Sequence, residues 1–268
     1  MNVQHSIDQN QADLERLIKK FRAFISKLKK DKSISQLAQF ILYTRSFNSF
    51  KAAILLADEG LPIECLNSLR LALETGWLAL VLKNDEHSAL EWLAMVRYHD
   101  MPEYPRKKYR KTYGNLTWIK STVSSDEIDK KQRENIYKIL SVRSHANVAT
   151  SFFVRGLPDG SSDYCLYEPG GIQDHDHRYR CLKSILFCLK YLLHDMERAK
   201  EGRFDCQWKY DHVELMHMSN VIWQDKNGQY VVDAEAINSA AQVTFLIAMS
   251  SILPKEAFEK LKQATEKT

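Results

Sequence analysis

The sequence predicts a mainly α-helical fold, a multi-helix bundle that carries one or two small β-hairpins. Only nine glycines and six prolines occur in 268 residues, and they fall between long segments whose apolar residues recur every three or four positions. In addition, 44% of the residues are hydrophobic, which is enough to bury a sizeable core. We therefore expect a single helical domain over residues 1–268.

The first part of the chain is predicted to hold four helices. The first covers about 8–30, where apolar residues follow helical spacing, and the second covers about 35–58 and stops at Gly60. The third covers 62–82 and is apolar almost all round, which is typical of a helix in the centre of a bundle. A fourth helix is expected over about 86–99.

The rest of the chain is predicted to combine long helices with hairpins. Residues 151–173 carry turn-forming residues between short aromatic runs, which indicates a loop or small hairpin. An Asn-Gly pair between β-prone runs predicts a second hairpin over 220–233. The expected helices cover about 125–149, 175–200 (capped by Gly202), 234–252 and 255–266.

Two charged residues lie one turn apart in the apolar helix 62–82. Arg70 and Glu74 share a side with Asn67, and their neighbours are Leu and Ala. Because buried charges are costly unless they are paired, the two should meet each other or a polar group from a neighbouring helix. They are either a structural ion pair that fixes helix register or one wall of a site, since perturbed charges concentrate at sites.

A second polar set lies in the helix predicted over 125–149. Tyr137, Ser141 and His145 are four residues apart and therefore form a column on one helix face. His145 lies on the more polar face, either as a structural residue or as a general acid or base. Arg143 lies within the apolar arc of the helix and is a second candidate partner for Glu74.

These two patterns resemble a bacterial family of unknown function related to the HEPN domains. The Arg-x-x-x-Glu and Tyr-x-x-x-Ser-x-x-x-His patterns carry the resemblance, which covers roughly residues 35–150. It implies a HEPN-like helical core over 8–150, with 151–268 as a hairpin-and-helix extension packed on that core. It also implies a homodimer that binds or cleaves RNA without metal or cofactor, as a toxin or phage-defence effector with an operon-encoded protein partner.

The HEPN ribonuclease signature is an Arg followed, after four to six residues, by a His. No Arg in this chain has a His at that distance, and the nearest match before His145 is Lys138. By resemblance, His145 would be the acid or base, and Lys138, Arg143 or Arg70 would stabilise the phosphorane. Glu74 and Ser141 would complete the candidate catalytic set.

A basic segment with interleaved tyrosines follows the fourth predicted helix. Cations suit phosphates, and aromatic rings suit unstacked bases, so the segment is a candidate nucleic-acid-binding surface; the alternative is a solvated loop. Its residues are Arg106, Lys107, Lys108, Tyr109, Arg110 and Lys111.

Other features bound the function more weakly. The run Asp174–His177 offers two His and two Asp but matches no common metal motif, so we predict no metal site. Five cysteines without a CxxC pair, and no secretory or membrane-spanning segment, favour a cytoplasmic protein with reduced thiols. The sequence lacks a Gly-rich phosphate loop and a Gly-x-Ser-x-Gly elbow, which argues against common nucleotide-dependent enzymes and serine hydrolases.

A non-catalytic helical protein–protein interaction module remains the alternative function. In that interpretation, both polar sets are structural seams and partners bind an exposed apolar or basic surface. The net charge of +4 is mildly basic and compatible with either function.

Overall fold

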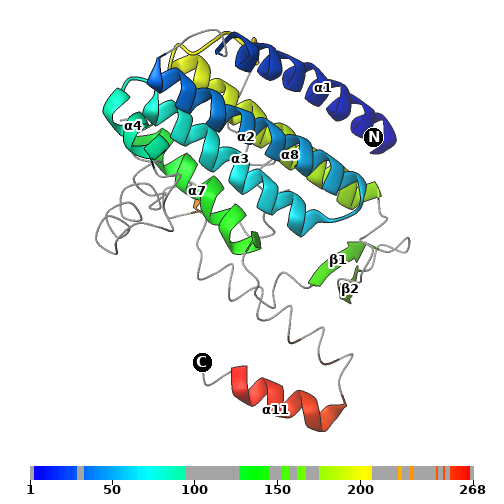
Figure 1. Ribbon diagram of the computed structural model, residues 1–268. Helices are drawn as coiled ribbons and strands as arrows, with labels where there is room; N and C mark the ends of the chain where they lie inside the picture. The colour runs from blue at the N-terminus through cyan, green and yellow to red at the C-terminus, as the bar shows by residue number, and fades with distance from the viewer. Residues whose placement is uncertain are drawn as a thin grey trace.

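The computed structural model shows a mainly helical protein, as the sequence predicts (Figure 1). It describes residues 3–28, 33–94, 123, 127–144, 152–156, 162–166, 175–206, 223–224, 230–231, 246, 250 and 254–265. The helices are α1 (Val3–Leu28), α2 (Ile34–Asp58), α3 (Pro62–Leu82), α4 (Glu86–Ala94), α7 (Glu127–Ser144), α8 (His175–Arg198) and α11 (Lys255–Thr265).

Two short strand pairs accompany these helices. Strand β1 (Phe152–Gly156) pairs antiparallel with β2 (Ser162–Leu166), and β3 (Trp223–Gln224) pairs antiparallel with β4 (Tyr230–Val231). The helix predicted over 234–252 falls almost wholly outside the described residues.

Helix α3 occupies the centre of the bundle, as its nearly uniform apolar composition predicts. It packs against α2, α7 and α8, while α1 covers α2 and α8 on the other side (Figure 1). Cys65, Leu69, Leu73 and Trp77 on α3 are all at most 1% exposed. By length and composition α3 could cross a bilayer, but 61% of its apolar window is buried inside the protein, as in the core helix of a bundle.

The turn between α2 and α3 forms as the sequence predicts. Gly60 has a φ of 71°, a left-handed conformation that glycine adopts at no steric cost. The Leu61 amide donates to the Leu56 carbonyl at 2.8 Å, and the Gly60 amide donates to the Ala57 carbonyl at 3.2 Å. These bonds satisfy carbonyls at the end of α2 and direct the chain back into α3.

Helix α8 ends close to the predicted position of about 200, but the predicted capping residue, Gly202, is not the residue that ends it. The left-handed residue is Lys200, with a φ of 59°, and the helix ends at Arg198. The Glu201 amide donates to the Met196 carbonyl at 2.9 Å, so the chain turns two residues earlier than expected. Gly202 instead gives room to aromatic rings, because an added Cβ would lie 3.2 Å from Phe24.

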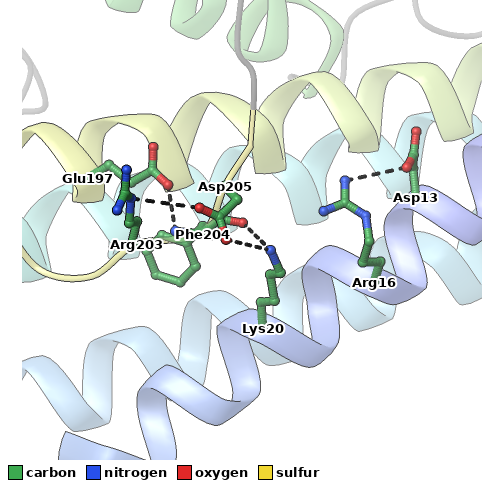
Figure 2. Close-up of polar contacts among 7 residues, drawn as sticks. All are labelled: Asp13, Arg16, Lys20, Glu197, Arg203, Phe204 and Asp205. Atoms are coloured by element: carbon green, nitrogen blue, oxygen red, sulfur yellow. Dashed lines mark hydrogen bonds and ion pairs between the residues drawn. The ribbon is translucent and has the colours of Figure 1, made fainter.

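The segment after α8 is fastened to α1 by polar contacts (Figure 2). Lys20 on α1 donates from Nζ to the Phe204 carbonyl at 2.7 Å and to the Asp205 carboxylate at 3.3 Å. Glu197 on α8 accepts a hydrogen bond from the Phe204 amide at 2.5 Å. These bonds place the Phe204 ring, which is 2% exposed, against Phe24 in the core.

A buried carboxylate, Glu201, joins three helices at the same end of the bundle. Its Oε1 accepts a hydrogen bond from Gln39 on α2 at 2.5 Å and lies 3.6 Å from Nζ of Lys83, which follows α3. The Glu201 side chain is only 5% exposed. Burial therefore raises the pKa of the Glu201 carboxyl, while Lys83 and Gln39 oppose that shift.

We expect Glu201 to make stability fall as pH rises. Because its folded-state pKa exceeds the ordinary value of 4.5, the native state holds this proton to higher pH than the unfolded chain does. Stability therefore decreases from about pH 4.5 until the native carboxyl has ionised. Glu201→Gln should remove that part of the slope in urea denaturation measured across this pH range. A variant whose pH dependence matches that of the wild type would contradict the assignment.

Candidate functional site

The Arg70–Glu74 pair expected from the sequence is present on α3. Nε of Arg70 donates to Oε1 of Glu74 at 2.6 Å. The two side chains retain 24% and 22% of their exposure, so the pair is half-buried rather than sealed in the core. A pair in this position is partly solvated, and water can reach both charges.

Tyr137 on α7 completes this cluster. Nη2 of Arg70 donates to the Tyr137 hydroxyl at 2.8 Å, and the guanidinium carbon lies 5.1 Å from the centre of the tyrosine ring. The structure therefore brings together part of each polar set that the sequence singled out. We call Arg70, Glu74 and Tyr137 the α3/α7 cluster.

The α3/α7 cluster contains a carboxylate, a guanidinium and a phenol in fixed relative positions. A carboxylate held by an arginine can accept a proton, and a guanidinium can stabilise a developing oxyanion. The same three groups can equally hold two helices in register, because each makes a hydrogen bond within the protein.

Several predicted site residues lie outside this cluster or outside the residues that the structure describes. Ser141 lies one turn beyond Tyr137 on α7 and is partly buried. His145, the side chain of Arg143 and the whole basic segment Arg106–Lys111 fall outside the described residues. The proposed meeting of His145 with Arg70 and Glu74, and of Arg143 with Glu74, therefore stays a prediction.

Sequence analysis missed a second ion pair, which is the most deeply buried in the described structure. Arg133 on α7 donates from Nη2 and Nε to the two carboxylate oxygens of Asp195 on α8, at 2.6 and 3.0 Å. Both side chains are 1% exposed. Nε1 of Trp77 on α3 donates to Oδ2 of Asp195 at 3.2 Å, so the carboxylate binds groups from two other helices.

The Arg133–Asp195 pair has the properties of a structural ion pair that holds α7 against α8. Burial raises the pKa of the Asp195 carboxyl, and the two hydrogen bonds from Arg133 oppose that shift. The arginine also lies over the Tyr191 ring, with its guanidinium carbon 5.9 Å from the ring centre. A carboxylate that is enclosed in this way has no face open to a substrate.

The two ion pairs lie along one seam, where α7 meets α3 and α8. Arg70, Glu74 and Trp77 follow each other at helical spacing on α3, and Arg133 and Tyr137 do so on α7. Arg70 meets Tyr137, whereas Trp77 and Arg133 share Asp195, so the helices run antiparallel. The buried pair thereby fixes the helix that presents Tyr137 to Arg70.

Among the described residues we looked for side chains that could bind a metal ion and for reactive cysteines. Within the described ranges, no three His, Cys, Asp or Glu side chains are grouped so as to hold a metal ion. Cys65, Cys181 and Cys188 are buried free thiols, as the sequence predicts. A hydrogen bond with Cys181, together with burial, raises the pKa of the Cys65 thiol, which makes it a poor nucleophile.

The fold and this seam define a helical bundle with a polar interhelical cluster. Comparison of the chain with protein-family models, with curated proteins and with solved structures gives no match.

Proposed function

We propose that the protein is a HEPN-like protein that binds or cleaves RNA, with the α3/α7 cluster as part of its site. The observation that supports this proposal is the half-buried, water-accessible meeting of Arg70 and Glu74 with Tyr137. These residues belong to the two sequence patterns on which the resemblance to HEPN-related proteins depends. The Arg70–Glu74 pair lies on α3, a helix whose other residues are largely apolar, and charged residues are uncommon on such a helix.

The chemistry would be a transfer of the phosphodiester within the RNA. A base removes the proton of a ribose 2′-hydroxyl, whose oxygen attacks the adjacent phosphorus. The bond to the 5′-oxygen then breaks, and an acid returns a proton to that oxygen, leaving a 2′,3′-cyclic phosphate. Glu74 and His145 are the candidate proton carriers, and Arg70 is the candidate cation for the phosphorane.

The basic segment would add affinity for the substrate. Its five cations would neutralise backbone phosphates, and Tyr109 would stack on an unpaired base. Binding that depends on such contacts weakens as salt concentration rises.

The test is cleavage of varied RNAs by the purified protein in the presence of a chelator. We expect the wild type to produce 2′,3′-cyclic phosphate ends, and Glu74→Gln and His145→Ala each to lower the rate by about 10²–10⁴-fold. Glu15→Gln, at an exposed carboxylate of α1, is the matched control and should retain full activity. Wild type and variants that are equally inactive and fail to bind RNA would refute the proposal.

The alternative is a non-catalytic interaction module. It is favoured by the hydrogen bonds that Arg70 already makes within the protein and by four exposed apolar side chains on α2 and α4. In that case Glu74→Gln would lower thermal stability but would not remove any RNA-directed activity. The exposed apolar residues are Leu37, Ile41, Leu55 and Leu90.

A further inference from the structure

Helices α3 and α8 run parallel to each other and pack in a constant register. An added Cβ at Gly76 on α3 would lie 2.6 Å from the Leu192 side chain on α8. Further along, Nζ of Lys83 donates to the Ala199 carbonyl at 2.5 Å. Both contacts join residues that are 116 positions apart in the chain. Because the separation does not change along the contact, the two helices point in the same direction.

The same register extends back to the first turns of both helices. Each helix carries a row of buried residues spaced alternately by four and three positions, as expected of a face packed on a neighbouring helix. Two of the α3 positions hold only Ala72 and Gly76, which lets the backbones approach closely. The register pairs Cys65 with Cys181, Leu69 with Ile185, Ala72 with Cys188, and Gly76 with Leu192.

The first of these pairs consists of two thiols in contact. Cys65 and Cys181 form a hydrogen bond with each other, which agrees with the register of the helices. Both are free thiols, and the side chains are buried, Cys65 at 0% and Cys181 at 6% exposure. A disulfide requires that two cysteines face each other at short range, and the register and the hydrogen bond together supply that arrangement.

We propose that Cys65 and Cys181 are a redox pair, which a peroxide oxidises to a reversible disulfide between α3 and α8. Cys181 reacts first, because it keeps some exposure where Cys65 has none. The hydrogen bond with Cys181 and burial also raise the pKa of the Cys65 thiol, so Cys65 keeps its proton and is the second sulfur to react.

The oxidation takes place in two steps. In the first, the Cys181 sulfur attacks one oxygen of the peroxide, the O–O bond breaks, and a sulfenic acid and one water form. In the second, the Cys65 sulfur attacks the sulfenic sulfur, and the S–O bond breaks. The released hydroxide takes the proton of the Cys65 thiol and leaves as a second water. The two thiols together lose two electrons to the peroxide, and a small dithiol returns them.

The disulfide makes the oxidised protein more stable than the reduced one. The two cysteines are 116 positions apart, so their bond closes a long loop and restricts the unfolded chain. The inference goes beyond the proposed function and does not depend on RNA binding or on the α3/α7 cluster. Its readouts are a covalent bond and a melting temperature, so its failure and the failure of the proposed function are separate results.

The experiment treats the folded, reduced full chain with hydrogen peroxide, blocks the remaining thiols with iodoacetamide and digests the protein without a reductant. Mass spectrometry should find peptides linked through Cys65 and Cys181 within one copy of the chain. The melting temperature of the oxidised protein should exceed that of the reduced protein by about 10 °C. Dithiothreitol should remove both the linked peptides and the rise in melting temperature.

Single variants assign the effect to this pair. Cys181→Ala should lose the linked peptides and the rise in melting temperature. The matched controls, Cys188→Ala and Cys206→Ala, each remove another buried thiol and should keep both effects. A wild type in which Cys65 and Cys181 remain free thiols after peroxide treatment, or in which Cys65 pairs with Cys188, would overturn the proposal.

Discussion

Replacement of Asp195 by Asn should lower the free energy of unfolding by about 3–5 kcal/mol. The change leaves the Arg133 guanidinium, whose side chain is 1% exposed, without the carboxylate that accepts its two hydrogen bonds. Removing one partner of a buried ion pair costs far more free energy than the intact pair contributes to stability. Urea denaturation of wild type and variant at neutral pH measures the difference.

Two further variants show whether the loss of stability comes from breaking this buried pair or from removing any carboxylate. Asp13→Asn breaks the Arg16–Asp13 pair, whose side chains are 46% and 31% exposed, and should cost less than about 1 kcal/mol. The double variant Arg133→Met with Asp195→Leu should recover most of the lost stability, because it removes the buried guanidinium together with the buried carboxylate. If Asp195→Asn has the same free energy of unfolding as the wild type, the pair does not stabilise the fold.

Replacement of Gly76 by Ala should lower the free energy of unfolding by about 1–3 kcal/mol. Within a helix this change normally stabilises, by about 1 kcal/mol. Here the added Cβ would lie 2.6 Å from Cδ2 and 2.7 Å from Cδ1 of Leu192 on α8. Leu192 is 0% exposed, so its side chain would have to repack among other buried side chains to make room for the methyl group.

The clash can be tested by removing the residue that causes it. Leu192→Ala alone opens a cavity and should destabilise the protein by about 2–5 kcal/mol. The double variant with Gly76→Ala should cost less than the two single changes added together, because the new methyl group enters that cavity. A stabilising effect of Gly76→Ala in the wild-type background would contradict the close approach of α3 and α8.

The sequence predicted the helices well where their composition is strongly apolar or where glycine or proline marks their ends. Helix α3 begins and ends at the predicted residues. Gly60 follows α2 in the left-handed conformation that glycine favours. Helix α1 already begins at Val3, before the predicted start at about 8, because polar residues continue a helix without an apolar pattern. The left-handed Lys200 was not predicted, because nothing local distinguishes it from other exposed lysines.

For the candidate site, the sequence could predict the contact within one helix but not the contact between two helices. Arg70 and Glu74 are four residues apart, so their contact follows from helical geometry. The contact with Tyr137 depends on how α3 and α7 align, which local spacing does not determine. A signal for Arg133 did exist, since it shares a helix face with the buried Ile136 and Leu140.

The seam where α7 meets α3 and α8 also restricts how far α7 can slide along its axis. Arg133 and Tyr137 lie one turn apart, about 6 Å along the axis of α7, and each is held by a different partner. A slide of α7 by one turn would break both contacts at once. The two contacts together therefore hold α7 at one position along its axis. A ligand that reaches the half-buried α3/α7 cluster would therefore require rotation of side chains and not a shift of α7.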